Sequence, residues 1–204
     1  MANKPAATFT NTDLRKPKET KQCKPFKQPP ANYPIFTVDP APEASKPVVE
    51  AIRKMFGGVV PNLFAVSAIS PQLITAQATL NQLIGETSLT NLEVQVIDLA
   101  VSRENDCAYC LAAHTFLARR LDQDVIGAAK AGTAIADPKI EAIRQFAIEL
   151  VETRGHVSEA GREAFLAAGN TKEQAMEVIL VVALKQLQNH VNEIAKTPID
   201  SLFS

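Results

Sequence analysis

Cysteine and histidine side chains that could carry out chemistry gather in one short stretch, residues 104–114, with the sequence ENDCAYCLAAH. If this stretch is helical, Cys110 and His114 are one turn apart and Cys107 lies on the same face. A cysteine in the first turn of a helix faces the positive end of the helix dipole, which favours its thiolate. His114 could accept the proton of Cys110, and the two cysteines could form a disulfide after one is oxidised to a sulfenic acid. The spacing therefore indicates thiol redox chemistry.

Two other interpretations of these residues stay open on the sequence alone. Two cysteines and a histidine can be zinc ligands, but a structural zinc site needs four ligands, and the chain has no second Cys-x-x-Cys or His-x-x-His pair. Free cysteine is also among the most buried residue types, so the three side chains could simply pack in the core. A thioredoxin-type site is excluded, because that site follows a strand and a helical pattern precedes this one. We expect neither a metal nor a cofactor.

The elements around this stretch are all predicted to be helical. Thr90-Asn91-Leu92-Glu93 matches a capping box and predicts a helix through Val101, while Asp106 is predicted to cap the helix that carries the cysteines. Other predicted helices run from a cap at Ser45 to about residue 56, over residues 71–86, and over about residues 172–196. Further N-cap candidates are Asp122, Asp137, Ser158 and Thr171. No segment alternates with a period of two, so the predicted fold class is all-α.

The composition divides the chain into a tail and one domain. Residues 1–34 hold seven lysines or arginines against two acidic residues, together with six of the 13 prolines. We interpret them as an extended, basic, proline-rich tail, and residues 35–204 as a single helical domain. Cys23, in the tail, is expected to be a free thiol without a catalytic role. We expect no nucleic-acid partner, because the tail lacks interleaved aromatic residues and the rest of the chain is acidic.

The overall composition excludes several classes of protein. The 204 residues are 46% hydrophobic and 21% charged, with 8 glycines and 3 cysteines. These proportions exclude an intrinsically disordered protein, a collagen-like repeat and a small disulfide-stapled domain. The longest apolar run, residues 178–184, is far shorter than the roughly 18 residues that cross a bilayer. Since the start has no apolar signal-type stretch, we expect a cytoplasmic protein that has no membrane partner.

The segment Ser88–Thr115, SLTNLEVQVIDLAVSRENDCAYCLAAHT, resembles the core of the carboxymuconolactone decarboxylase superfamily, in its alkylhydroperoxidase (AhpD-like) branch. Residues 41–64 and 184–203 are similar to the segments that flank this core in peroxidase-related members, so the likeness covers most of residues 35–204. The resemblance implies an all-α, AhpD-like fold of paired helices, a homo-oligomer such as a trimer or hexamer, and hydroperoxide reduction through the cysteine pair. It also implies that Cys110 attacks the peroxide, that Cys107 resolves the product, and that His114 relays protons with a glutamate.

One position departs from the pattern of that branch. The relay glutamate lies twelve residues before the first cysteine, where this chain has Gln95. An amide does not take up a proton at neutral pH, so another carboxylate must serve if the relay works. We consider two candidates, Glu104, just before the active stretch, and Glu93, which the predicted capping box already occupies. We favour Glu104.

The sequence thus predicts an enzyme, a thiol-dependent peroxidase that acts on alkyl hydroperoxides and is reduced by a dithiol or thioredoxin-like donor. Two alternatives stay open. The chain could be a helical assembly protein that senses redox state without turning over quickly, because both functions need reactive thiols. It could also be a decarboxylase-like lyase, although the decarboxylase branch of the resembled superfamily lacks the cysteine pair.

Overall fold

The computed structural model describes residues 33–203, and this part of the chain contains helices and no strand, which confirms the predicted all-α fold class. Almost all of the predicted tail, including Cys23, lies outside the described residues. The helices are α1 (Lys46–Met55), α2 (Asn62–Ser67), α3 (Pro71–Ile84), α4 (Asn91–Glu104), α5 (Ala108–Leu117), α6 (Gln123–Ala131), α7 (Pro138–Glu152), α8 (Glu159–Ala167) and α9 (Lys172–Ala195), followed by the short 3₁₀ helix η1 (Ser201–Phe203).

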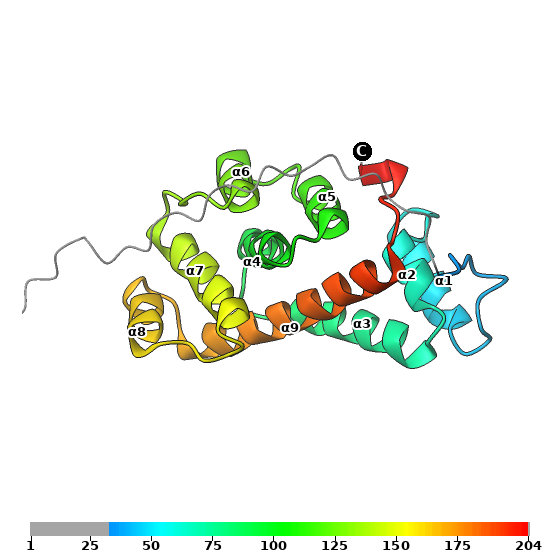
Figure 1. Cartoon of the computed structure of the whole chain (residues 1–204), viewed down its shortest axis with the longest axis horizontal. Helices are drawn as coiled ribbons and strands as arrows, with labels where there is room; N and C mark the ends of the chain where they lie inside the picture. Colours follow the sequence, from blue (N-terminus) through cyan, green and yellow to red (C-terminus); the bar gives the residue numbers. More distant parts are fainter. Residues whose placement is uncertain (1–32, 204) are drawn as a thin grey trace, which may run out of the picture.

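Helix α4 lies at the centre of the domain. Figure 1 shows it end-on, and it packs against α5, α6, α7 and α9. All of its residues from 95 to 102 are buried. Ile97 and Val101 face the core formed with α7, α8 and α9, while Val96 and Leu99 face the core formed with α6. Because this helix is enclosed, each polar side chain in its middle must find a partner inside the protein.

Most of the predicted helix starts are confirmed. Thr90 and Glu93 form the capping box of α4, and Thr171 forms a second one with Gln174 at the start of α9. The side chains of the other predicted caps accept hydrogen bonds from backbone N–H groups; these are Asp122, Asp137 and Ser158. Ser45 stands at the expected position, but its hydroxyl donates to the carbonyl of Ala68 at 2.7 Å and caps nothing.

The prediction that Asp106 caps the cysteine-bearing helix is wrong. Asp106 has a left-handed backbone, with φ of 52°, and ends α4 in a Schellman motif. Its N–H bonds the carbonyl of Arg103 at 3.1 Å, and the N–H of Cys107 bonds the carbonyl of Ser102 at 2.8 Å. Aspartate tolerates this conformation better than most residues do. The N-cap of α5 therefore falls on Cys107, one residue later than predicted.

The segment after α9 forms hydrogen bonds with both α5 and the start of α2. Lys196 adopts a left-handed conformation at the end of α9, and the chain then turns back toward the cysteines. The carboxylate of Asp200 accepts a hydrogen bond from the phenol of Tyr109 at 2.6 Å and another from the backbone N–H of Asn62 at 3.1 Å. Although α9 has 24 residues, none of the described helices is both long and apolar enough to cross a membrane.

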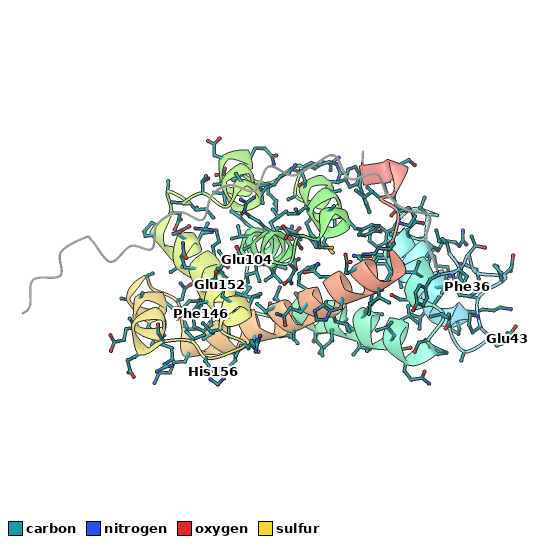
Figure 2. All side chains as sticks on the ribbon, in the orientation of Figure 1. Phe36, Glu43, Glu104, Phe146, Glu152 and His156 are labelled. Carbon is teal, nitrogen blue, oxygen red and sulfur yellow. The ribbon has the colours of Figure 1, made fainter. Side chains whose placement is uncertain are left out.

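We expect Glu93→Gln to destabilise the protein. The Glu93 carboxylate accepts the backbone N–H of Thr90 at 2.7 Å and pairs with the ammonium group of Lys139 at 3.0 Å, which ties α4 to α7. Loss of a helix cap costs about 0.5–2 kcal/mol. Chemical denaturation should show this loss, whereas Glu104→Gln should leave the midpoint nearly unchanged, since Glu104 is half-exposed at the end of α4 (Figure 2). Equal midpoints for the two variants would contradict the structural role of Glu93.

Candidate active site

The two cysteines lie together at the start of α5. Cys107 is the N-cap residue and is 8% exposed, and Cys110 follows in the first turn and is 1% exposed. Leu63, Tyr109 and Ala113 pack with them in one apolar cluster. The side-chain amide of Asn192, from α9, donates to the sulfur of Cys110 at 3.2 Å and lies 3.7 Å from the sulfur of Cys107. Both thiols are free, so the structure shows the reduced pair.

The environment of the pair favours a thiolate on Cys107. A hydrogen bond from the Cys110 thiol, together with the Cys110 backbone N–H, Asn192 and the cation of Lys185, outweighs burial and lowers the pKa of Cys107 to about 6. The same hydrogen bond, with burial, raises the pKa of the Cys110 thiol well above its ordinary value. The two sulfurs therefore share one proton, and at rest it belongs to Cys110.

His114 lies one turn beyond Cys110 on α5 but binds other partners than the sulfurs. Its Nδ1 is 2.9 Å from the side-chain oxygen of Gln95 and 3.3 Å from the carboxylate of Asp98, both on α4. Its Nε2 contacts the ammonium group of Lys185 on α9. The ammonium group can only donate, so Nε2 accepts and Nδ1 carries the proton. Among the contacts of the described residues, none joins the imidazole to either cysteine sulfur.

Lys185 is the centre of a buried polar network. It is 2% exposed, and its ammonium group lies 3.3 Å from the carboxylate of Asp98, itself 6% exposed. It also donates to the side-chain oxygen of Gln188 at 2.7 Å. The ammonium protons are thereby directed at the carboxylate of Asp98 on α4, the imidazole of His114 on α5 and the amide oxygen of Gln188 on α9. A buried charge is tolerated when it is paired and fully hydrogen-bonded in this way.

Burial shifts the pKa values of the two titratable partners of Lys185 in opposite directions. It raises the pKa of the Asp98 carboxyl, and the nearby ammonium group of Lys185 only partly offsets this effect. Burial, assisted by the same cation, lowers the pKa of His114 well below its ordinary value. His114 is therefore a neutral imidazole at neutral pH, with its tautomer fixed by Lys185.

Neither carboxylate named from the sequence contacts this network. Glu93 is bound to Thr90 and Lys139 at the opposite end of α4 from the cysteines. Glu104 lies at the cysteine end of α4, and within residues 33–203 no contact joins its side chain to the network. Their proposed part in a relay stays a prediction. The position of the missing glutamate, Gln95, does contact His114, but it carries an amide.

Sequence reasoning missed three residues of the site, namely Asp98, Lys185 and Asn192. A signal was present for the first two, because each is a lone charge inside a mainly apolar helical run, VIDLAV and VVALKQL, and the charges are of opposite sign. Asn192 gave no such signal, since asparagine is common on exposed helix faces. The two other histidines are exposed. His156 lies in the loop between α7 and α8 (Figure 2), and His190 lies on α9.

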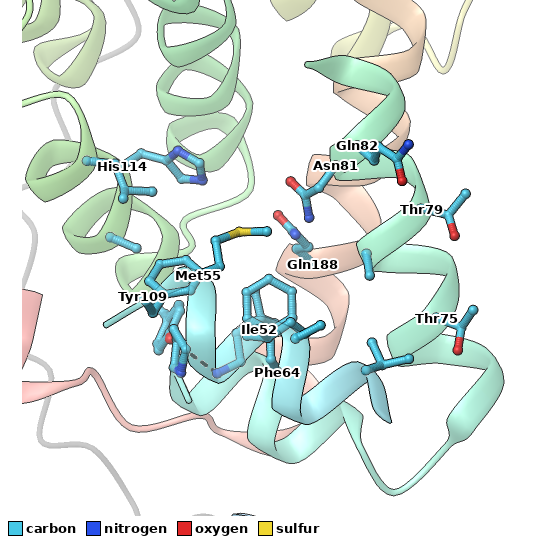
Figure 3. A pocket seen from close by; sticks show the side chains of 18 of the residues that line it. Ile52, Met55, Phe64, Thr75, Thr79, Asn81, Gln82, Tyr109, His114 and Gln188 are labelled. Atoms are coloured by element: carbon cyan, nitrogen blue, oxygen red, sulfur yellow. Dashed lines mark hydrogen bonds between the residues drawn. The ribbon is translucent and has the colours of Figure 1, made fainter. Parts of the chain in front are cut away.

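A cavity of about 700 Å³ opens beside the network. Its walls are mainly apolar and come from α1, α2, α3 and α5, with Ile52, Met55 and Phe64 among them. In Figure 3, the imidazole of His114 points toward this space from α5, and Gln188 approaches it from α9. Leu63, Tyr109 and Ala113 line the cavity and also pack on the cysteines. The cavity has the size and character of a site for an organic molecule.

Residues 33–203 contain no cluster of three or more His, Cys, Asp or Glu side chains that could hold a metal ion. The three residues that the sequence allowed as zinc ligands are directed elsewhere. Cys107 and Cys110 interact with each other and with Asn192, while both nitrogens of His114 have partners in the polar network.

Solved structures with the same arrangement of helices carry peroxidase-related names. An uncharacterised peroxidase-related protein from Ralstonia eutropha JMP134, described as an alkylhydroperoxidase AhpD core, matches with a TM-score of 0.75 and 23% identity over 86% of this chain and 95% of its own. One from Silicibacter sp. TM1040 matches with a TM-score of 0.70 and 23% identity over 87% and 95%. The chain has the AhpD-like fold. The family resemblance of the sequence is thereby confirmed at the level of the fold.

A third AhpD-like structure is that of a cysteine-to-alanine variant of the debrominase Bmp8, in complex with 2,3,4-tribromopyrrole. It matches with a TM-score of 0.68 and 17% identity, over 79% of this chain and 88% of its own. No protein-family model matches the sequence. No curated protein matches it either. Proteins named for different activities thus share this fold, so the fold alone does not determine what this chain does.

We expect the cysteine pair to ionise at a much lower pH than an ordinary thiol. With Cys23→Ser as background, the ultraviolet absorbance of the thiolate should rise by one thiolate per chain, with a midpoint at about pH 6. Asn192→Leu should raise the midpoint, because it removes a donor to both sulfurs.

Cys107→Ser is the control, because it removes the Cys107 thiolate and should abolish the step at about pH 6; it also removes the hydrogen bond that raises the pKa of the Cys110 thiol. The folded pKa of Cys107 lies below its unfolded value, so the thiolate stabilises the fold above about pH 9 and that contribution is lost as the pH falls to about 6. A wild-type midpoint near the ordinary thiol pKa of about 8.5 would contradict this account.

Proposed function

We propose that the chain reduces hydroperoxides through a dithiol–disulfide cycle of Cys107 and Cys110. The observation that carries the proposal is the placement of two free thiols at the start of α5, with the side-chain amide of Asn192 at 3.2 Å from the sulfur of Cys110 and at 3.7 Å from that of Cys107. The lowered pKa of Cys107 agrees with this arrangement. A thiolate attacks peroxide oxygen, whereas a thiol does not. A second thiol one turn away can then form the disulfide without a large movement of the backbone.

The reaction balances with one proton taken from outside the pair. The thiolate sulfur bonds the terminal oxygen of ROOH, the O–O bond breaks, and the alkoxide RO⁻ leaves. Because the resting pair holds a single proton, the proton that converts RO⁻ to ROH comes from elsewhere. The cysteine is now a sulfenic acid. The sulfur of the other cysteine attacks it, the S–S bond forms, and the hydroxyl leaves as water with the proton that the pair held. An external dithiol then returns two electrons and one proton to the pair and releases its other proton.

Following the family resemblance, we assign the attack to Cys110 and the resolving step to Cys107. At rest the proton belongs to Cys110, so it first moves to Cys107 along the hydrogen bond between them. Asn192 supports this chemistry at both sulfurs. Its amide nitrogen donates to Cys110, and its side-chain oxygen is buried with no hydrogen-bond partner within residues 33–203. That oxygen is available to accept the O–H of a hydroperoxide or of a sulfenic acid.

Stoichiometric hydroperoxide should convert the pair into a disulfide. We expect it to remove two titratable thiols per chain and to produce a Cys107–Cys110 disulfide that mass spectrometry detects, with steady-state peroxide consumption when a dithiol donor is added. Cys110→Ser should abolish consumption. Absence of the disulfide would refute the proposal, while a disulfide without turnover would favour the redox-sensing alternative.

Trapping of sulfenic acid with dimedone tests which sulfur attacks. In Cys107→Ser the adduct should form on Cys110, and Cys110→Ser should give none. An adduct on Cys107 of the second variant would reverse the two roles.

The cavity beside the network supports an organic hydroperoxide as substrate. We expect kcat/KM to be higher for cumene hydroperoxide than for hydrogen peroxide, because the organic body can occupy apolar space next to the site. Ala78, a half-buried residue of α3 that lines the cavity, provides the test. Ala78→Phe should lower kcat/KM for cumene hydroperoxide and leave that for hydrogen peroxide unchanged. Ala76→Phe, on the exposed face of the same helix, is the matched control. Equal effects of Ala78→Phe on the two peroxides would argue against this use of the cavity.

A further inference from the structure

The side chains on α4 that face His114 show a carboxylate displaced by one helical turn. Gln95 stands at the position of the missing glutamate, and Asp98 follows three residues later on the same face. Both reach the same imidazole nitrogen, Nδ1 of His114, at 2.9 and 3.3 Å. The site therefore still holds a carboxylate against the imidazole, but that carboxylate lies deeper within the enclosed part of α4.

The buried carboxylate is balanced by a cation from another helix. Lys185, on α9, lies 3.3 Å from Asp98. Within residues 33–203 no further lysine or arginine pairs with Asp98, and Lys139, from α7, pairs with Glu93 instead. The ammonium group of Lys185, the imidazole of His114 and the carboxylate of Asp98 together carry no net charge. Among these three groups, the ammonium group is the one that can donate a proton to a substrate. His114 cannot supply one readily, because burial keeps it neutral and its only N–H faces Gln95 and Asp98.

The ammonium group does not line the cavity itself, but two of its partners, His114 and Gln188, do. Its positive charge favours the thiolate forms of both cysteines. The same charge would stabilise the negative charge of an alkoxide formed at the cysteines. A positioned acid of this kind contributes about 10² to 10⁴-fold to a rate.

We propose that Lys185 is the acid that protonates the leaving alkoxide, and that Asp98 and His114 are positioning residues that hold its ammonium group. This inference rests on the hydroperoxide reduction proposed above. In the step, the thiolate and ROOH form the sulfenic acid and RO⁻. Lys185 gives RO⁻ the proton that it otherwise donates to Gln188, which leaves ROH and a neutral amine. The amine then regains a proton from water. Asp98 and His114 keep the lysine side chain in place throughout, and neither changes its bonds.

The test compares oxidants whose leaving groups differ in their need for a proton. An alkyl hydroperoxide expels a strongly basic alkoxide, whereas a peracid expels a stable carboxylate. Lys185→Met alone would leave Asp98 as an unpaired buried charge, so the main variant is Lys185→Met/Asp98→Asn. We expect its rate of single-turnover oxidation by tert-butyl hydroperoxide to fall by about 10² to 10⁴-fold, and its rate with peracetic acid to fall far less. The ratio of the two rates is the readout, because a change in the thiolate fraction alters both rates equally.

A second ion pair in the same protein provides the matched control. Arg144, which is buried on α7, pairs with Glu141 at 2.6 Å, away from the cysteines. Arg144→Met/Glu141→Gln should change stability without changing the ratio of the two rates. If the main variant loses both rates equally, Lys185 only shapes the site or the thiolate, and the inference is wrong. If it loses neither rate, the inference is also wrong. A wild-type protein that is oxidised by neither reagent would overturn the proposed function itself.

Discussion

The ion pair between Asp98 and Lys185 is the interaction on which the arrangement of this site depends. Asp98 lies in the middle of α4, where eight consecutive residues are buried, so its charge is tolerated only with a cation opposite. Lys185 supplies that cation from α9 and, through the same ammonium group, fixes the tautomer of His114 on α5. One pair of charges thus sets the relative positions of three helices around the cysteines.

The second constraint is the tight junction between α4 and α5. A Schellman motif centred on Asp106 ends α4, and Cys107 is both its last bonded residue and the N-cap of α5. The connection between α4, which holds Asp98, and α5, which holds the thiols, is therefore short and hydrogen-bonded. Asn105 extends the same junction to α9, because its side chain donates to that of Asn189 at 2.8 Å. The two cysteines and the polar network therefore form one connected unit.

Local signals predicted the fold well, and the location of the thiols with it. The capping box at Thr90 and the N-cap at Thr171 depend on neighbours within four residues, so the sequence shows them directly, and the structure contains both. The second capping box, which Thr171 forms with Gln174, was not predicted. The prediction for Asp106 was wrong because only residues 105–107 lie between α4 and α5, and the conformation of Asp106 depends on how α4 ends. The partners of His114 were missed for a different reason. They come from α4 and α9, and only packing of the whole chain brings Lys185, 71 residues away, to its imidazole.

The carboxylate of this site stands at position 98 and not at position 95, and this difference affects its burial and its pKa as well as its position. Gln95 is at the edge of the buried run of α4, whereas Asp98 is well inside it, and burial there raises the pKa of its carboxyl. A carboxylate placed so deep needs a buried cation, so Asp98 and Lys185 depend on each other and neither could be replaced alone without leaving an unpaired charge. The ammonium group of Lys185 also contacts His114 and Gln188, which line the cavity. The buried carboxylate and the acid that we propose therefore form one pair, and the position of Asp98 in the sequence determines where that acid can lie.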